Sequence, residues 1–264
     1  MEVIFNNGIR LGYERQGSGI PLLLIHGFPL DHTVWQPLVH YLGGNFDMLM
    51  PDLRGFGQSD LPEGEYGLTD MATDLVGLLD QLHITKTYLA GHSMGGYVAL
   101  AFANIYPDRV LGLSLIGSQA LPDSSERQLA RQVTAQQVAV NGSSAVVGMS
   151  ENLSADPRFF SFFREIILRQ SPPGLIGALK AMAIRPDATS FLSKFEFPIE
   201  LVHGLADALI PIDRAHEIKL IIPQATLIEL PGVGHSPMLE APEQTALALI
   251  QLSAQTTGKW NPFT

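Results

Sequence analysis

Residues Tyr88–Tyr97 read Y-L-A-G-H-S-M-G-G-Y, and this stretch decides the fold. An apolar strand is predicted to run into Gly91, and a helix rich in Ala and Leu to leave Gly95, which is the strand–turn–helix setting of a G-x-S-x-G nucleophile elbow. Both glycines suit a tight turn, because a side chain at either position would collide with the adjoining strand and helix. We therefore predict Ser93 as a nucleophile, with the Met94 N–H directed at the place where an oxyanion would form.

The sequence around this turn alternates between strand-like and helix-like segments. The G-x-S-x-G pattern alone would occur by chance in about one unrelated chain of this length in ten, so the flanking segments are needed to support the prediction of an elbow. Apolar runs typical of strands buried on both faces are Pro21–Ile25, Phe46–Met50, Thr87–Ser93, Val110–Ile116, Ile199–His203 and Thr226–Leu230. Helices are expected over residues 34–42, 69–82 with Thr69 as N-cap, 94–105, 212–221 and 243–253.

A hairpin is predicted ahead of these elements, because the Asn6-Asn7-Gly8 turn separates the strand-like runs Val3–Phe5 and Ile9–Arg15. Together the strands predict an α/β fold with a mostly parallel, eight-stranded sheet covered by helices on both faces. The tail Gly258–Thr264 is expected to be frayed.

The alternation breaks between residues 121 and 195, where no convincing strand occurs. Helix starts are indicated there by Asp123 three residues before Glu126, by Asp156-Pro157 and by Pro172-Pro173. We interpret this segment as a helical insertion that forms a cap. The predicted domains are a core of residues 1–120 and 196–264 and a cap of residues 121–195.

Composition narrows the class of protein. The 264 residues include 26 acidic and 16 basic side chains, giving a formal charge of −10, which opposes binding to nucleic acid or an anionic membrane. There is no cysteine, so thiolate nucleophiles, thiolate metal sites and disulfides are excluded. The N-terminus does not resemble a signal peptide, in which a basic region is followed by an apolar region. No apolar run reaches the length of a membrane span. We expect a soluble, cytoplasmic protein.

Two further residues complete a possible catalytic set with Ser93. Asp207 and His235 each lie just past the end of a predicted parallel strand, and such ends meet at one edge of the sheet. A serine hydroxyl needs a base to take its proton, and that base needs a carboxylate to hold its tautomer. Ser93, Asp207 and His235 therefore predict a catalytic triad in the chain order that accompanies the elbow.

The chain resembles the α/β-hydrolase superfamily along its whole length. His26-Gly27-Phe28-Pro29 resembles the H-G-x-P oxyanion loop, and Asp52–Ser59 resembles the D-x-R-G-x-G-x-S segment. Gly91–Gly95, Gly204–Asp207 and Gly234-His235 resemble the elbow, acid and histidine loops. The resemblance implies an oxyanion hole formed by the backbone N–H groups of Phe28 and Met94, and loop-bracing roles for His26, Asp52 and Arg54.

Other titratable residues have weaker claims to a role. Asp123 follows a strand where some relatives place the triad acid, but Asp207 is favoured, and Asp213 is expected at a helix start. The remaining histidines, which follow no base-like pattern and are expected on the surface or in loops, are His32, His40, His83, His92, His203 and His216. No metal site and no cofactor are predicted, because no histidine pair has helical zinc-site spacing.

The substrate is predicted from the nucleophile and the insertion. A serine favours acyl transfer to water, and the insertion contains no Tyr, Trp or His but supplies apolar side chains for a pocket, including Met149, Leu153, Phe159, Phe163, Leu175, Leu179 and Met182. We expect small to medium carboxylic esters as substrates. Arginines that could bind a substrate carboxylate, although a solvated helix face is favoured for them, are Arg158, Arg164, Arg169 and Arg185.

Several alternatives stay open at this stage. Enol-lactonases, carbon–carbon bond hydrolases and cofactor-free haloperoxidases or perhydrolases share the triad. Trp35 after H-G-F-P-L resembles the haloperoxidases, whereas Leu30-Asp31-His32 departs from the usual oxyanion loop of the carbon–carbon hydrolases. A ligand-binding receptor with slow or no turnover is the alternative from another class. The chain is expected to act as a monomer or homodimer.

Overall fold

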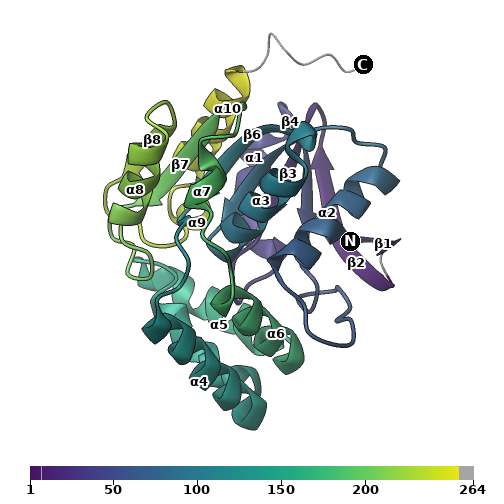
Figure 1. Ribbon diagram of the computed structural model, residues 1–264, viewed down its shortest axis with the longest axis vertical. Coiled ribbons are helices and arrows are strands. Elements are labelled where there is room, and N and C mark those ends of the chain that lie inside the picture. The colour runs from purple at the N-terminus through teal and green to yellow at the C-terminus, as the bar shows by residue number, and fades with distance from the viewer. Residues whose placement is uncertain (7, 256–264) are drawn as a thin grey trace.

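An eight-stranded sheet forms the centre of this computed structural model, which describes residues 1–6 and 8–255 (Figure 1). The strands are β1 (Glu2–Asn6), β2 (Ile9–Gly17), β3 (Ile20–Ile25), β4 (Phe46–Pro51), β5 (Thr87–His92), β6 (Val110–Ile116), β7 (Ile199–Gly204) and β8 (Thr226–Leu230). They lie in the order β1-β2-β4-β3-β5-β6-β7-β8. The pairs β1/β2 and β2/β4 are antiparallel and all other neighbours are parallel, which confirms the predicted mostly parallel sheet.

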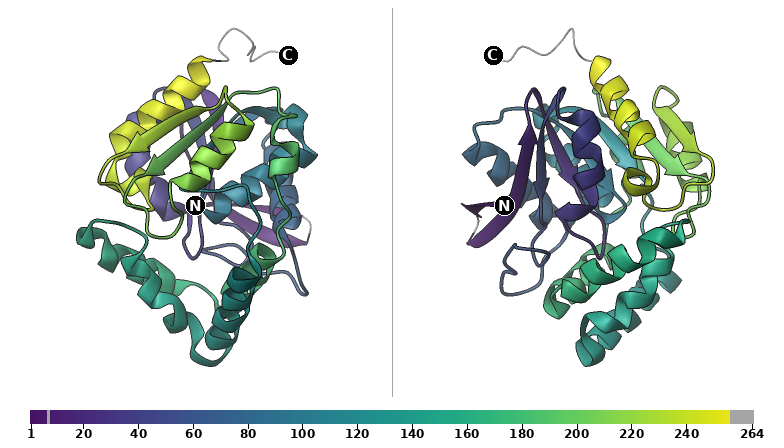
Figure 2. Two further views of the ribbon diagram at one scale, coloured as in Figure 1. Left: turned by 60° about the vertical axis from the view of Figure 1, so that its left-hand side comes forward. Right: turned by 180° about the vertical axis from the view of Figure 1, so that it is seen from behind.

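Helices cover both faces of the sheet, as predicted. Strands β4, β5 and β7 are buried at every position, because helices lie above and below them. Figure 1 shows α2 (Leu68–Gln81), α3 (Met94–Ile105) and α8 (Asp213–Ile221) on one face. Figure 2 shows α1 (Gln36–Leu42) and α10 (Pro242–Ala254) on the other. Short helical turns η1 (His32–Trp35), η2 (Pro107–Arg109) and α9 (Pro237–Glu240) connect these elements.

Two helix starts differ from the prediction. Helix α2 begins at Leu68 with Gly67 as N-cap rather than Thr69, because the Asp70 carboxylate accepts the Gly67 N–H at 2.7 Å. Helix α4 (Ser125–Asn141) is capped by Ser124, whose hydroxyl accepts the Arg127 N–H, rather than by Asp123. The carboxylate of Asp123 pairs with arginines instead.

The segment between β6 and β7 is helical, and we call residues 121–195 the insertion. It contains α4, η3 (Gly142–Glu151), η4 (Pro157–Phe159), α5 (Phe160–Arg169), α6 (Pro172–Ala183) and α7 (Thr189–Leu192). The predicted starts at Asp156-Pro157 and Pro172-Pro173 are confirmed, with Asp156 and Ser171 as the N-caps. Helices α4, α5 and α6 gather at one end of the molecule (Figure 1). We propose that the insertion acts as the cap.

Polar contacts tie the insertion to loops that follow three parallel strands. Arg169 binds Asp31 after β3, Gln170 accepts the Gly57 N–H after β4, and the Ala155 N–H binds Glu240 after β8. The insertion therefore lies over the carboxyl-end edge of the sheet, where ligands bind in α/β folds.

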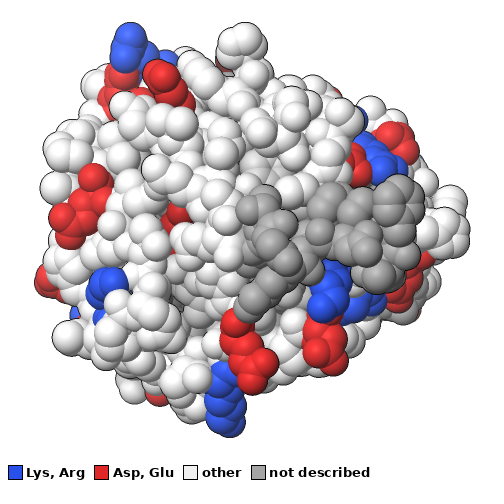
Figure 3. Space-filling model, turned by 90° about the horizontal axis from the view of Figure 1, so that it is seen from above, with Lys and Arg blue, Asp and Glu red and all other residues white. Residues whose placement is uncertain are grey.

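At the end of the molecule opposite α4–α6, acidic and basic side chains are interspersed (Figure 3). In the part of the chain that the structure describes, none of the helices combines the length and apolar character needed to cross a membrane. The tail Gly258–Thr264, expected to be frayed, lies outside the described residues.

Candidate active site

Ser93 stands in a strained turn between β5 and α3. Its backbone has φ +52° and ψ −114°, a left-handed conformation that costs a non-glycine residue about 1–3 kcal/mol. The Ser93 N–H donates to the Ile116 carbonyl at 2.9 Å, and the Ser118 hydroxyl donates to the Ser93 carbonyl at 2.9 Å. The end of β6 and its following loop therefore hold Ser93 in place.

The glycines on either side of Ser93 are required by close backbone contacts. A Cβ at Gly91 would collide with the Gly95 carbonyl, and a Cβ at Gly95 would collide with the Ile25 carbonyl of β3. The turn is therefore as tight as the sequence predicts, with β3, β5 and α3 meeting around it.

Asp207 and His235 are in direct contact. The His235 Nδ1 lies 2.7 Å from Asp207 Oδ2, and both side chains are buried. The other oxygen, Asp207 Oδ1, accepts the backbone N–H groups of Leu209 at 2.8 Å and Ile210 at 2.9 Å. Because a carboxylate only accepts, His235 carries its proton on Nδ1, which leaves Nε2 free to accept another proton.

The environment keeps Asp207 ionised. Burial raises the pKa of Asp207, but the His235 charge and the hydrogen bonds from His235, Ile210 and Leu209 together outweigh burial and hold the pKa below its ordinary value. An anionic carboxylate next to His235 stabilises the imidazolium that forms when His235 takes up a proton.

These loops meet at one edge of the sheet. A Cβ added to Gly117 would lie 2.9 Å from the His235 carbonyl and 3.5 Å from Asp207 Oδ2. Gly117 directly follows Ile116, whose carbonyl binds the Ser93 N–H. The residues predicted as a triad are therefore grouped around the end of β6.

The two backbone amides predicted for the oxyanion hole are in buried residues, Phe28 and Met94. Within residues 1–6 and 8–255, neither N–H donates a hydrogen bond to another protein group. The loop that carries Phe28 is braced by His26, whose Nε2 accepts the Leu53 N–H at 2.9 Å and whose Nδ1 lies 3.0 Å from the Gly27 carbonyl. Buried amides without an acceptor are rare in folded proteins, and they suit a site that binds negative charge.

Two histidines expected on the surface or in loops are buried in strands, so that prediction is wrong for them. His92 in β5 donates from Nε2 to the His235 carbonyl at 2.8 Å, and His203 in β7 donates to the Ile210 carbonyl at 2.7 Å. Their position within continuous apolar runs is the signal that could have placed them in the core.

Asp31, His32 and Asp52 offer three potential metal ligands within 4.8 Å of one another. The carboxylate oxygens of both aspartates already accept hydrogen bonds. Asp31 accepts from Arg169, Gln170 and Thr33. Asp52 accepts from His32 and Gln58. The Arg169 guanidinium also places a positive charge against Asp31, which opposes a cation there. This donor set fits a brace of the oxyanion loop better than a metal site.

Most of the arginines considered for substrate recognition have other partners. Arg185 is only 3% exposed and binds Asp123 at 2.7 Å, so the prediction of a solvated face is wrong for it. Arg169 pairs with Asp31 at 2.8 Å, and exposed Arg158 pairs with Asp156. Arg169 thus attaches the insertion to the core, whereas Arg185 and Asp123 pair within the insertion.

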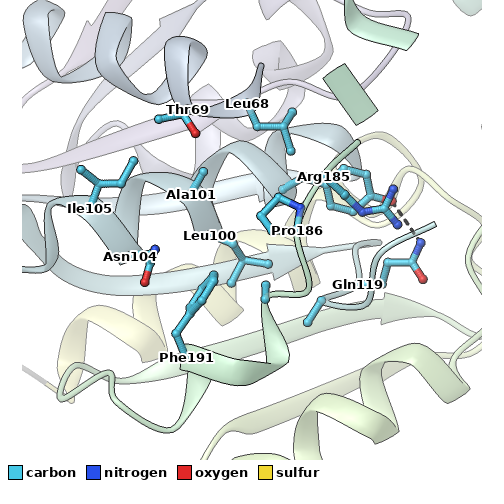
Figure 4. Close-up of a pocket in the computed structure, with 13 residues that line it drawn as sticks. Leu68, Thr69, Leu100, Ala101, Asn104, Ile105, Gln119, Arg185, Pro186 and Phe191 are labelled. Carbon is cyan, nitrogen blue, oxygen red and sulfur yellow. Dashed lines mark hydrogen bonds between the residues drawn. The ribbon is translucent and has the colours of Figure 1, made fainter. Parts of the chain in front are cut away.

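A pocket of about 70 Å³ lies along the flank of α3, away from Ser93, Asp207 and His235 (Figure 4). Its walls are mostly apolar, and Gln119 and Arg185 stand at one end. The Gln119 amide donates to the Tyr97 hydroxyl at 3.3 Å, and the Arg185 guanidinium lies over the Tyr97 ring at 4.2 Å. The polar groups at this end bind one another, so the pocket is part of the junction between α3 and the insertion.

Comparison with known proteins identifies the family of this chain. A family model described as the alpha/beta hydrolase family matches residues 22–248. A thermophilic esterase from Thermogutta terrifontis, solved with malate bound, superposes with a TM-score of 0.92 at 35% identity and covers 97% of this chain and 99% of its own. Lipase 1 from Psychrobacter immobilis is 27% identical over 265 residues, which are 91% of this chain and 79% of the lipase.

One curated relative is considerably longer than this chain. The dihydrolipoyllysine-residue acetyltransferase component of the acetoin cleaving system from Pseudomonas putida is 32% identical over 237 residues, which are 86% of this chain and 61% of that protein. Esterase and lipase relatives support a hydrolase. Since the family model spans most of the sequence, the chain belongs to the alpha/beta hydrolase family.

Proposed function

We propose that the protein is a serine hydrolase that cleaves small to medium carboxylic esters through an acyl-enzyme intermediate. The observation that carries this proposal is the buried Asp207–His235 pair, with a 2.7 Å contact, beside a serine held in a strained elbow. Ser93 acts as nucleophile and His235 as general base. Asp207 holds the tautomer and stabilises the imidazolium.

The reaction follows from the protonation states. His235 Nε2 takes the hydroxyl proton as Ser93 Oγ attacks the ester carbonyl, and the carbonyl oxygen becomes an oxyanion. His235 then gives that proton to the departing alcohol, which leaves an acyl group on Ser93. Water attacks the acyl-enzyme by the same steps, with His235 again taking and returning a proton. The products are the acid and the alcohol.

The oxyanion is stabilised by the amides of Phe28 and Met94. Both are buried, and neither has an acceptor among the residues that the structure describes, so they can bind the developing charge without first breaking a protein hydrogen bond. Donors of this kind contribute about 3 kcal/mol each to catalysis. Met94 also begins α3, so its N–H lies at the positive end of the helix dipole.

The ester class is inferred from the insertion and the relatives. Apolar side chains of the insertion that are buried or half-buried, and from which a pocket wall over the sheet edge can be built, include Met149, Phe159, Phe163, Leu175 and Met182. The Thermogutta relative is an esterase and the Psychrobacter relative is a lipase. We propose that these side chains form an apolar wall over Ser93, which would favour uncharged esters of short to medium chain length.

Turnover of p-nitrophenyl esters from acetate to long acyl chains, measured in wild type and Ser93→Ala, tests this function. We expect many turnovers per chain, a maximum at short or medium acyl length, and loss of about 10³-fold or more in the variant. Activity that persists in Ser93→Ala would overturn the serine mechanism. A single turnover, or none across the series, would overturn ester hydrolysis and favour the alternative of a ligand-binding receptor.

A further inference from the structure

His92 occupies the position directly before Ser93 and touches the loop that carries His235. Its side chain is buried, and its Nε2 lies 2.8 Å from the His235 carbonyl oxygen. The two imidazole rings have centroids 4.8 Å apart. These residues are 143 positions apart in sequence, so the contact joins the end of β5 to the loop after β8.

The protonation state of His92 follows from its partner. A backbone carbonyl can only accept, so Nε2 carries the proton and Nδ1 is bare. Burial, and to a lesser extent the neighbouring His235, lower the pKa of His92 to about 3. His92 is therefore neutral at any pH at which a hydrolase of this kind works. A neutral ring with one fixed donor suits a structural link, and it does not compete with His235 for protons.

His92 also contacts the oxyanion loop. A Cβ added to Gly27 would lie 2.6 Å from His92 Nδ1 and 3.0 Å from the His92 carbonyl oxygen. Gly27 immediately precedes Phe28, whose N–H is a proposed oxyanion donor. The ring of Trp35 also meets the His92 ring edge-on, at 6.5 Å between centroids. One imidazole thus packs against the histidine loop and the oxyanion loop.

The backbone around His235 is held from two sides. The Glu240 carboxylate accepts the N–H groups of Gly234 at 2.9 Å and Ser236 at 3.2 Å. The carbonyl of His235 between them is held by His92. Removing the His92 donor would leave the planar peptide between His235 and Ser236 held through the Ser236 N–H alone among the hydrogen bonds of the described residues, so this peptide could tilt and shift the His235 backbone.

We propose that His92 is a positioning residue, which sets the backbone of His235 and the Gly27-Phe28 turn in register with Ser93. This inference rests on the proposed serine hydrolase function. Its physical basis is that a displacement of about 1 Å between nucleophile and base can cost 10²-fold in rate. His92 does not touch substrate in this scheme, and its effect passes through the main chain of its two neighbours.

A pair of amide variants separates this role from a general loss of packing. In His92→Gln the side-chain nitrogen takes about the place of Nε2 and can still reach the His235 carbonyl, whereas in His92→Asn it takes about the place of Nδ1 and cannot. Tyr88→Phe is the control, because Tyr88 lies in the same strand and its hydroxyl donates to the Ser253 carbonyl at 3.2 Å, at the other end of the strand.

The measurements are kcat and KM on the best p-nitrophenyl ester, thermal stability, and the downfield proton NMR signal of His235 Nδ1–H. We expect His92→Asn to lower kcat about tenfold or more with KM changed less than twofold, and to shift the NMR signal. His92→Gln should keep kcat within about threefold, and Tyr88→Phe should lose stability with kcat and the signal unchanged.

Equal kcat in His92→Asn and His92→Gln, after correction for folded fraction, would overturn the positioning role. An unchanged Nδ1–H signal in His92→Asn would also overturn it. Ser93→Ala in the same series isolates the function itself, since residual activity there would refute the serine mechanism while the NMR comparison still tests the link between His92 and His235.

Discussion

Asp123 and Asp207 both follow adjacent parallel strands, β6 and β7, and both carboxylates are removed from solvent, but they have different partners. Asp123 is paired with Arg131 and Arg185, and more distantly with Arg127. Asp207 is paired with His235 and accepts two backbone N–H groups. In both residues burial raises the pKa of the carboxyl group. The partners lower this pKa by a larger amount, so it lies below its ordinary value.

The difference lies in what the partners can do. An arginine stays charged at every working pH, so Asp123 is a permanent ion-pair centre that joins α4 to the return of the insertion at Arg185. In the proposed mechanism His235 takes up and returns a proton, so Asp207 would stabilise a partner whose charge changes during the reaction. The role of a carboxylate that follows a strand is therefore indicated by its partner and not by its place in the fold.

The largest expected effect comes from Asp207→Asn. The amide cannot stabilise an imidazolium and can hold the wrong histidine tautomer, so kcat should fall by about 10⁴-fold while the fold is kept. Steady-state kinetics with p-nitrophenyl esters and circular dichroism check this. Asp123→Asn is the matched control, with kcat expected within about threefold of wild type. If the two variants lost kcat equally, the comparison would fail.

Asp123→Asn should instead act on stability. Arg185 is 3% exposed, and without Asp123 its charge would be buried with only carbonyl acceptors and the Tyr97 ring. Breaking a buried ion pair on one side costs about 3–5 kcal/mol. Urea unfolding of wild type and variant measures this. A change below about 1 kcal/mol would show that the arginine cluster contributes little, contrary to our interpretation.

The sequence predicts both loops and the pairing of Asp207 with His235, but not the arginine partners of Asp123. The strands could be predicted because continuous apolar runs have few other interpretations in a chain of this class. Ser93, Asp207 and His235 can be predicted because each follows a strand and lies within three residues of a glycine. Their roles stay a proposal that the variants above test.

The parts that sequence missed depend on contacts between distant segments. Asp123 looked like a helix cap because Glu126 follows at the right spacing, but Arg131 and Arg185 draw its carboxylate away and leave Ser124 to cap α4. His92 looked like a loop residue because its partner, the His235 carbonyl, lies 143 positions away. No local pattern encodes such a pairing.

Glu200 is a third buried carboxylate, and its pH dependence is expected to be opposite to that of Asp123 and Asp207. Glu200 in β7 is buried and accepts one hydrogen bond, from Ser114 of β6, and burial raises its pKa to about 7. A raised pKa gives stability that is present below the unfolded pKa of about 4.5 and is lost as pH rises through about 7. The lowered pKa values of Asp123 and Asp207 give stability that is lost only as pH falls into the acid range.

The stability of the wild type should therefore decline between about pH 4.5 and 7, because the buried Glu200 becomes ionised. Glu200→Gln should remove this decline. We expect the variant to be more stable than wild type at pH 8 by about 2 kcal/mol, with a smaller difference at pH 5. Urea unfolding at both pH values measures it. A variant whose stability falls as steeply as that of wild type over this range would contradict a buried, protonated Glu200.

The smallest effect should come from Arg127→Gln, which tests whether the two carboxylates act separately. Arg127 lies 4.0 Å from Asp123, is 45% exposed, and donates to the Leu209 carbonyl at 3.2 Å. The Leu209 N–H in turn binds Asp207, so Arg127 bridges the two loops. Because an exposed ion pair contributes less than about 1 kcal/mol, we expect a change in unfolding free energy below that value and kcat within twofold.

The bridge can be tested further in a double-mutant cycle with Asp123→Asn. If the loops are independent, the effects on stability should add within about 0.5 kcal/mol, and kcat of the double variant should equal that of Asp123→Asn. A drop in kcat confined to variants that lack Arg127 would mean that the arginine cluster of the insertion helps to hold Asp207 through Leu209. The carboxylates of Asp123 and Asp207 would then form one coupled unit, and the distinction between them would be one of degree.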